Sequence, residues 1–419
     1  MKLINSDCIA TMKAMPDNFI DAIVTDPPYE LGFMGKSWDS TGIAFNVEVW
    51  QEALRVLKPG GHLIAFSGSR TYHRMAVAIE DAGFEIRDQI MWVYGSGFPK
   101  SMDISKAIDK QAGAMREVVG EKITGRALGG SNWKDGDAGG QEFVAITEPS
   151  TDEAKQWQGW GTALKPAHEP MVLARKPVVG TIANNVLTYG VGGLNIDASR
   201  VGTDVMVNPP GSTNPRLAMG DGWREDAEPT TATGRWPANF IHDGSDEVVG
   251  LFPSVKGATS RTPTKPSNAT SYVLGGDSNT PIYDDGLNTS AARFFYCAKT
   301  SKRDRNEGLD GFEAKRDHDG RAEGKVGGDN PRNRTNAEKL NHHPTVKPTS
   351  LMQYLVRLVT PAGGTVLDPF MGSGSTGKAC AYEGFNFIGI DQSAEYVEIA
   401  RARIDFALAH KEEMLDVDI

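Results

Sequence analysis

The stretch Val366–Gly377, VLDPFMGSGSTG, joins a short apolar run to a glycine-rich turn and then to an Ala-rich helical pattern. The run Thr365–Leu367 predicts a strand, Asp368 stands at its end, and Gly372 and Gly374 follow. Small residues in such a turn let the backbone approach a ligand, and the first amides of the next helix supply hydrogen-bond donors. The stretch therefore predicts a strand, turn and helix that together bind a nucleotide.

A second carboxylate supports this interpretation. Asp391 ends the next strand-like run, Asn386–Ile390, and follows Asp368 by 23 residues. An acidic residue about 20 positions beyond the glycines commonly binds a ribose hydroxyl. The pattern favours an adenosine-containing ligand, and the alternative is a strand-to-helix turn that binds nothing.

The same glycines fit a second motif. Gly372, Gly377 and Lys378 match the G-x-x-x-x-G-K spacing of a phosphate-binding loop. That loop needs Ser or Thr next to hold magnesium, whereas this chain has Ala379. We therefore favour an adenosine-cofactor enzyme over an ATPase.

Composition indicates a soluble globular protein. The chain has 419 residues, of which 39% are apolar and 23% charged, enough to bury one large core or two smaller ones. The first residues, MKLINSDCIA, lack a basic and apolar signal segment, and no run approaches the roughly 18 apolar residues of a membrane span. We expect a cytoplasmic protein with no membrane contact. Because the three cysteines are widely separated and show no C-x-x-C spacing, we expect neither disulfides nor a metal site.

The charge distribution bears on nucleic-acid binding. A net charge of −10 argues against a protein that coats nucleic acid nonspecifically. Residues 293–347 nevertheless contain 13 Lys and Arg against 9 Asp and Glu. This local excess suggests a DNA contact, with a solvated loop as the alternative, and its densest part is Lys299, Lys302, Arg303 and Arg305.

Strand-like runs alternate with helical patterns at both ends of the chain, which predicts a doubly wound parallel α/β sheet. Neither end has enough strands for a full sheet, so we expect both ends to complete one. Residues 1–175 would form the first part, with a mobile surface insertion at about 113–161, and 343–419 the last part. Residues 176–342 are rich in Gly, Pro, Asn, Ser and Thr and predict an irregular target-recognition region. The insertion carries Trp133, Trp157 and Trp160, which could stack on bases or pack the insertion itself.

A second chemical motif follows an early strand. The apolar run 22–25 leads into Asp26-Pro27-Pro28-Tyr29, where the prolines stiffen the turn that presents the other side chains. Together with Asp368-Pro369-Phe370-x-Gly372-x-Gly374, this motif resembles the amino-methyltransferases that transfer a methyl group from S-adenosylmethionine to exocyclic amines of DNA bases. The segment His343–Pro348 also resembles the family's cofactor-side segment. The motif order, catalytic first and cofactor last, is similar to that of the beta class.

The resemblance implies roles for individual residues. Asp26, Pro27, Pro28 and Tyr29 would be catalytic. Residues 32–36 and Trp38-Asp39 resemble the loop that closes over the target in some members. The implied cofactor contacts are Phe370, Gly372, Ser373 and Gly374 lining the pocket, Asp368 facing the methionine amino group, Lys347 near the methionine carboxylate, Asp391 at the ribose and Asp7 at the adenine. An Asp that caps the first helix is an equally good account of Asp7.

The chemistry explains these residue types. An exocyclic amine is a poor nucleophile until hydrogen bonds favour a more tetrahedral nitrogen, and the Asp26 carboxylate and Pro27 carbonyl can both accept from it. The base must leave the duplex, and Tyr29 offers an aromatic face for it. The acidic first motif residue favours N6-adenine as the target, with N4-cytosine as the rival. Other interpretations are an inactive nucleic-acid-binding module with this fold, or an RNA or protein methyltransferase. The resemblance also implies double-stranded DNA and a second copy of the chain as partners, whereas a partner endonuclease is left open.

Overall fold

The computed structural model describes residues 1–32, 37–97, 101–127, 141–208, 230–255, 289–298, 301–315 and 340–411. Its chain divides into two compact units, Met1–Gly95 with His168–Ile419, and Ser96–Ala167. The residues with an expected catalytic or cofactor-binding role and the basic cluster expected to contact DNA belong to the larger unit, whereas the tryptophans of the insertion belong to the smaller one. Of the loop expected to close over the target, residues 33–36 lie outside the described part of the chain.

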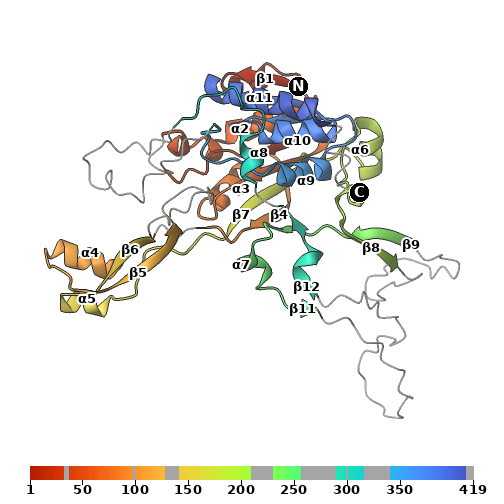
Figure 1. The fold of residues 1–419 in the computed structure, drawn as a ribbon. Helices are drawn as coiled ribbons and strands as arrows, with labels where there is room; N and C mark the ends of the chain where they lie inside the picture. Colours follow the sequence, from red (N-terminus) through yellow and green to blue (C-terminus); the bar gives the residue numbers. More distant parts are fainter. Residues whose placement is uncertain are drawn as a thin grey trace, which may run out of the picture. The chain divides into compact units, whose positions relative to one another are not determined.

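A nine-stranded sheet forms the centre of the larger unit (Figure 1). Its order is β1-β15-β14-β2-β3-β7-β4-β10-β13. Strands β14 and β15 of the last part pair in parallel with β2 and β1 of the first, so the prediction of one sheet built from both chain ends is confirmed. The strands are β1 Lys2–Asn5, β2 Ile20–Thr25, β3 Leu57–Phe66, β4 Glu85–Val93, β7 His168–Arg175, β10 Phe240–His242, β13 Tyr296–Cys297, β14 Thr365–Asp368 and β15 Asn386–Asp391.

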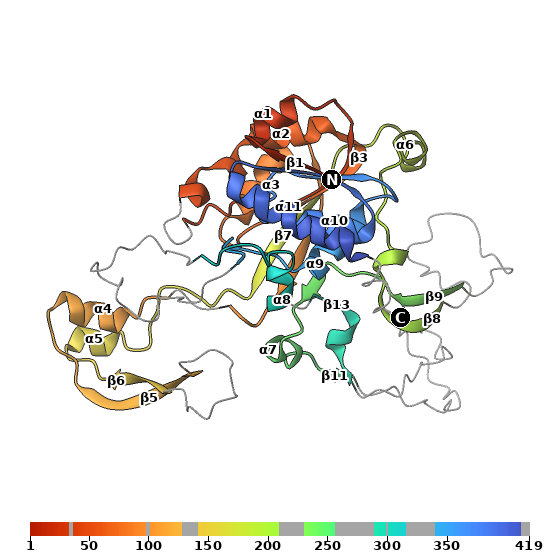
Figure 2. The same cartoon turned by 45° about the horizontal axis from the view of Figure 1, so that its top comes forward.

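Helices cover both faces of this sheet (Figures 1 and 2). Strand β2 shows the reason, because Ala22 and Val24 belong to one hydrophobic core and Ile23 to the other. Alternate residues of a strand point to opposite faces, so an unbroken apolar strand needs cover on both sides. One core is closed by α1 Cys8–Lys13, α2 Val47–Val56 and α3 Tyr72–Asp81, the other by α9 Thr349–Val359, α10 Ser375–Glu383 and α11 Ala394–Ala409. The doubly wound arrangement is thereby confirmed.

One strand departs from the expected parallel sheet. Strand β7 runs antiparallel to both β3 and β4, between which it lies. An antiparallel strand begins at the edge where its parallel neighbours end. The first residues of β7 therefore lie at the carboxyl edge of β2 and β3, where the site forms.

The described residues of the region 176–342 form more regular elements than the composition predicts. Its apolar islands become β10 and β13, which extend the sheet beyond β4 in parallel. Strands β8 and β9 pair separately, as do β11 and β12. The remaining elements here are α6 Ile182–Tyr189, β8 Val201–Asn208, β9 Thr230–Arg235, α7 Asp246–Val249, β11 Ser254–Val255, β12 Thr289–Ser290 and α8 Lys302–Asn306. Short 3-10 helices lie at Ser37–Ser40, Ile43–Phe45, Asp197–Ser199 and Ala291–Phe294.

The smaller unit contains an antiparallel hairpin and two helices. The hairpin is β5 Val118–Ala127 with β6 Gln141–Thr147, and the helices are α4 Ile104–Gln111 and α5 Asp152–Gln156. Its polar centre is Asp109, whose carboxylate accepts from the backbone amides of Ser150 and Thr151 and pairs with Arg116 at 2.7 Å. Burial works to raise the pKa of Asp109, but these hydrogen bonds outweigh it and hold the pKa at about 2.

Two of the insertion's tryptophans are described. The rings of Trp157 and Trp160 meet edge to face, with centroids 5.0 Å apart. They therefore contact each other within the smaller unit, whereas Trp133 lies outside the described residues.

Candidate active site

Three neighbouring strands bring the motif carboxylates to one edge of the sheet. Asp368 and Asp391 are the last residues of β14 and β15, and Asp26 directly follows β2. The three strands are adjacent and parallel, in the order β15-β14-β2. Ligands of open α/β sheets bind at this carboxyl edge. Two motifs that lie more than 300 residues apart in sequence thus meet in space.

The first motif is part of a buried polar cluster. The Tyr29 hydroxyl lies 2.9 Å from Asp26 Oδ1 and 2.9 Å from Glu169 Oε2. The Lys347 ammonium lies 2.7 Å from Asp26 Oδ2 and 3.2 Å from Glu169 Oε2. Two carboxylates therefore share the same phenol and the same ammonium.

Lys347 is buried beside the first motif. Its side chain is 6% exposed, and its ammonium contacts the two carboxylates. The expectation that this lysine lies near the methionine carboxylate of a cofactor stays a prediction. Burial lowers the pKa of Lys347, but the charges of Asp26 and Glu169 outweigh burial and raise it, so the ammonium form is favoured.

Burial raises the pKa values of both Asp26 and Tyr29. Burial raises the pKa of Asp26, while the nearby Lys347 ammonium opposes that rise. Burial also raises the pKa of Tyr29 well above its ordinary value, and the negative charges of Asp26 and Glu169 add to the effect. Tyr29 therefore keeps its proton and acts as a hydrogen-bond donor.

Sequence reasoning missed Glu169. No motif surrounds it, and its only signal is an acidic residue at the start of the apolar run 170–174. An ionisable residue beside a fully buried strand needs an ionic or hydrogen-bonding partner, because an unpaired buried charge costs free energy. Its partners, Tyr29 and Lys347, are distant in sequence, so only the fold identifies them.

Asp368 fixes the start of the glycine turn. The hydroxyls of Thr25 and Thr376 donate to its two carboxylate oxygens at 2.7 and 2.6 Å, and the Phe370 amide donates to Oδ1 at 3.1 Å. Burial raises the pKa of Asp368 to about 6, although these hydrogen bonds oppose the rise. The carboxyl thus ties β2, β14 and α10 together below the turn.

The turn itself requires its glycines. Gly372 has φ +50° and Gly374 φ +79°, both in the left-handed region. A Cβ on Gly372 would lie 2.7 Å from His343 Nε2, and a Cβ on Gly374 2.7 Å from the Ala400 side chain. Any larger residue would displace the His343 ring or helix α11.

Asp391 closes the turn from the neighbouring strand. Its Oδ2 accepts from the Gly372 amide at 2.9 Å, and its Oδ1 accepts from the Ser393 amide at 2.8 Å. A carboxylate offers about four acceptor positions, so it can bind a further hydroxyl. Asp7, by contrast, is the N-cap of α1: its Oδ1 accepts from the Ala10 amide at 2.9 Å, and its Oδ2 from Gln392 at 3.0 Å.

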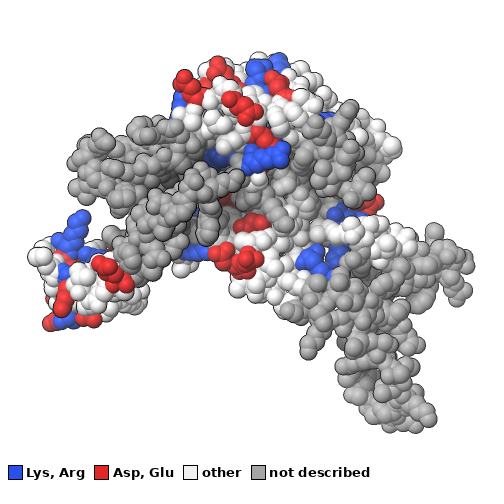
Figure 3. Space-filling view, viewed as in Figure 1, with Lys and Arg blue, Asp and Glu red and all other residues white. Residues whose placement is uncertain are grey.

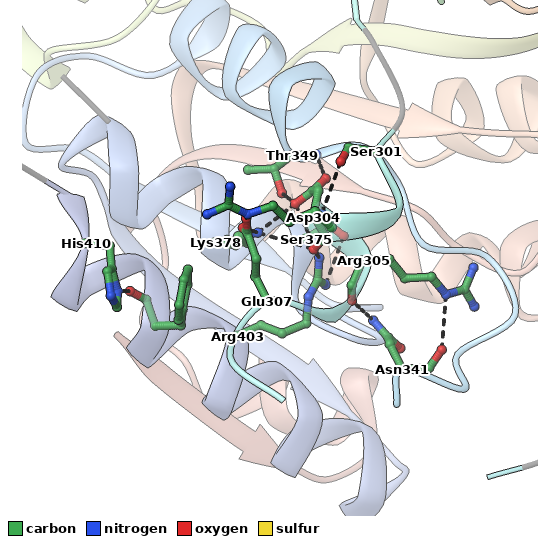
Figure 4. Close-up of polar contacts among 12 residues, drawn as sticks. Ser301, Asp304, Arg305, Glu307, Asn341, Thr349, Ser375, Lys378, Arg403 and His410 are labelled. Carbon is green, nitrogen blue, oxygen red and sulfur yellow. Dashed lines mark hydrogen bonds and ion pairs between the residues drawn. The ribbon is translucent and has the colours of Figure 1, made fainter. Parts of the chain in front are cut away.

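The lysine of the phosphate-loop motif points toward Asp304 and Glu307 (Figure 4). Lys378 is fully buried, and its ammonium lies 2.6 Å from Asp304 Oδ1 and 2.7 Å from Glu307 Oε2. The buried Arg403 donates to the Ser373 carbonyl at 2.7 Å and to the Asp304 carbonyl at 3.3 Å. Lys378 is therefore committed to ion pairs with the α8 segment, which excludes the ATPase alternative for this loop.

The basic segment around α8 has several roles. Arg305 donates to the carbonyls of Asn341 and His343 at 3.1 and 2.6 Å, so it holds the chain leading to Lys347. Its expected role as a DNA contact stays a prediction. Arg303 is 86% exposed and pairs with Glu307. Lys299 and the side chain of Lys302 lie outside the described residues.

Comparisons with known proteins show which family and relatives this chain is similar to. A family model described as "DNA methylase" (N6/N4) matches residues 20–402. The type II methyltransferase M2.DpnII of Streptococcus pneumoniae is 46% identical over 63 residues, covering 15% of this chain and 24% of the relative. The DNA adenine methyltransferase YhdJ of Escherichia coli K12 is 37% identical over 87 residues, covering 21% of this chain and 30% of the relative. The aligned segments thus span less than a third of either relative.

Solved structures of DNA methyltransferases also align with the chain. For M1.HpyAVI the TM-score is 0.39 at 15% identity, with 96% of this chain and 98% of that chain covered. For the cytosine-N4-specific PvuII methyltransferase the TM-score is 0.41 at 13% identity, with 99% and 92% covered.

The family model spans both motifs and the region between them. Its match begins in β2 and ends in α11, so it includes the buried polar cluster, the glycine turn and Asp391. The chain therefore belongs to the N6/N4 DNA methylase family.

Proposed function

We propose that this protein transfers a methyl group from S-adenosylmethionine to the N6 amine of adenine in DNA. The observation that carries the proposal is the placement of the Asp26–Tyr29 motif beside the glycine turn at one edge of the sheet. A target amine and a methyl donor held at these two places would meet at that edge. Family membership and the name of the Escherichia coli relative support the choice of reaction and base.

The glycine turn fits the proposed cofactor. The left-handed glycines leave the turn backbone without side chains, and the Asp391 carboxylate retains acceptor positions for a ribose. Gly372, Gly374, Phe370 and Ser373 would line the pocket. When bound, the cofactor supplies a methyl group already activated on a sulfonium. The protein mainly has to align the target nitrogen with that carbon.

The residues of the buried polar cluster would orient the target base and make its amine more nucleophilic. The Asp26 carboxylate and the Pro27 carbonyl accept hydrogen bonds from the amine and favour a tetrahedral nitrogen. The Tyr29 ring provides a stacking surface for the flipped base, and such stacking is worth roughly 1 to 3 kcal/mol. Asp26 is also placed to hold the proton that the methylated amine loses.

Nucleoside mass spectrometry of DNA from cells that express the protein tests this proposal. N6-methyladenine that appears only with the wild-type protein is the expected result. N4-methylcytosine alone would change the base but keep the reaction. Cofactor binding with no methylation of any DNA would favour the inactive binding module, and methylated RNA or protein would favour the other named alternative.

We expect Asp391→Ala to weaken cofactor binding. Each charge-assisted hydrogen bond is worth about 1.5 to 3 kcal/mol, so the loss of one such bond to the ribose predicts roughly a 10- to 150-fold rise in Kd. Calorimetry with S-adenosylmethionine measures it. Asp391→Asn, which can still accept one turn amide, separates turn geometry from ribose binding, and Asp405→Ala on the exposed side of α11 is a control. Unchanged affinity in a folded Asp391→Ala protein would remove this residue from the site.

We further propose that the region 176–342 contacts double-stranded DNA, partly through Lys299, Lys302 and Arg303. Figure 3 shows basic and acidic side chains interspersed over the described surface in that view, so local contacts matter more than a uniform field. The triple Ala variant should flatten the dependence of log K on log salt by about one for each phosphate that the protein no longer neutralises. Binding to duplex DNA over a salt series measures the slope, with exposed Lys13→Ala as control. An unaltered slope would leave these residues as a solvated surface.

The remaining expectations have direct tests. Within the described ranges, no helix is both long and apolar enough to cross a membrane. Among the described residues, no group of three or more His, Cys, Asp or Glu side chains is placed to hold a metal ion. We propose a homodimer in the cytoplasm, which sedimentation of the DNA-bound protein and cell fractionation would check.

A further inference from the structure

Glu169 reaches the catalytic motif because β7 runs against its neighbours. It is the second residue of β7 and lies opposite Trp92, close to the end of β4. In a parallel strand this position would lie at the opposite edge of the sheet. The antiparallel direction instead delivers a carboxylate, 21% exposed, to the edge that carries Asp26.

Asp26 and Glu169 compete for the same two donors. Tyr29 has one hydroxyl proton and lies equally far, 2.9 Å, from both carboxylates. It can therefore donate to only one of them at a time. The Lys347 ammonium has three protons and contacts both at once, at 2.7 and 3.2 Å.

An incoming amine needs a well-directed acceptor position on Asp26, whose carboxylate has about four such positions and already faces two donors. In the structure Asp26 Oδ1 faces the Tyr29 hydroxyl and Oδ2 faces the Lys347 ammonium. With Glu169 present, the Tyr29 hydroxyl can turn to Glu169 and release Asp26 Oδ1. Without Glu169, both donors would have Asp26 as their shared acceptor.

We propose that Glu169 is a positioning residue of the methyl-transfer site, which holds Tyr29 and Lys347 so that Asp26 can accept a hydrogen bond from the target amine. This inference rests on the proposed function. Glu169 itself forms no bond with the reacting atoms. Its effect passes through the orientation of Tyr29 and through its negative charge beside Asp26.

The charge effect has a defined direction. The ionisable groups that face Asp26 are Lys347, Glu169 and Tyr29, with Asp368 interacting at longer range, while Tyr94 faces Glu169 and Lys347. The negative charge of Glu169 adds to the burial that raises the pKa of Asp26. Removing that charge should lower the pKa of Asp26, so activity that needs the Asp26 carboxylate should persist to lower pH.

The test uses the full chain and duplex DNA that contains the methylated site mapped by sequencing. Glu169→Ala should lower kcat by about 10²-fold, as expected when a reacting group is misplaced, with little change in the KM for S-adenosylmethionine. Glu169→Gln, which keeps an acceptor for Tyr29, should retain more activity than Glu169→Ala. The acid limb of the pH profile of kcat should lie at lower pH for Glu169→Gln than for the wild type.

A second readout does not need turnover. Carboxyl-carbon NMR of protein labelled at aspartate, with Asp26→Asn for assignment, should show a lower pKa for Asp26 in Glu169→Gln than in the wild type. The matched control is Glu85→Gln, since Glu85 pairs with Arg175 at the other end of the same strand. This control should leave kcat, the pH profile and the pKa of Asp26 unchanged.

The outcomes are distinguishable. If the wild type methylates DNA but Glu169→Gln changes neither the acid limb nor the pKa of Asp26, the role of Glu169 is overturned and the proposed function stands. If the wild type methylates no DNA, the proposed function fails, and the inference with it. A Glu169→Ala protein that matches the wild type in kcat would also overturn the inference.

Discussion

Asp26→Ala should reduce methyl transfer by about 10²- to 10⁴-fold, the range that a well-placed acid or base contributes. The side chain is the acceptor proposed for the target amine. Glu169 also contacts Tyr29 and Lys347, but it belongs to β7 and not to the Asp26–Tyr29 motif. Cofactor binding should change little, because the glycine turn is held by Asp368 and Asp391. Single-turnover methylation of DNA and calorimetry with S-adenosylmethionine measure the two effects.

The fold should survive this substitution. Lys347 would keep Glu169 as its ionic partner at 3.2 Å, so the buried ammonium would remain paired. Asp26→Asn, which retains one acceptor oxygen, should keep more activity than Asp26→Ala. A folded Asp26→Ala protein that turns over normally would exclude Asp26 from the chemistry.

Lys347→Met should have the largest effect on stability. It would leave Asp26 and Glu169 facing each other without a cation, in a site where Lys347 is 6% exposed. Breaking a buried ion pair by removing one partner costs about 3 to 5 kcal/mol. Urea unfolding measures the change, and adding Glu169→Gln to Lys347→Met should recover part of it.

The deficit should also depend on pH. The pKa of Asp26 is raised in the folded protein, and the Lys347 charge limits that rise, so without Lys347 the folded state holds the proton more tightly. Stability is then lost as pH rises above the ordinary aspartate pKa. The free energy of unfolding of Lys347→Met should therefore lie further below that of the wild type at pH 8 than at pH 5. A deficit that is equal at both pH values would show that the charge is not its cause.

The parts of the site that sequence predicts lie at strand ends. Short apolar runs that end in Asp26, Asp368 and Asp391 identify three strands, and parallel strands must place their ends at one edge. The glycines of the turn are predictable for the same reason, because a turn between strand and helix that approaches a ligand needs them there. These features depend on local sequence alone.

The features that sequence does not predict depend on the direction of a strand or on partners that are distant in the sequence. The pattern of β7 is the same whichever way the strand runs, so sequence cannot place Glu169. The sequence also does not predict the observed partners of Lys347 and Arg305, because the contacts of such long side chains depend on the fold. Arg305 lies close to exposed Arg303 in the sequence, but it faces the segment 341–343.

The pairing of β2 with β14 has a consequence for how the chain folds during synthesis. Ala22 lies opposite Val366, and Lys2 lies opposite Ile388. At roughly 5 to 20 residues per second, the ribosome needs on the order of 20 to 70 seconds to make the chain between β2 and its partner. During that time β2 presents an unpaired edge and apolar faces that α9 and α10 later cover. Such a delay exposes the nascent chain to aggregation, so the yield of folded protein should depend on chaperones that shield β2 until β14 is made.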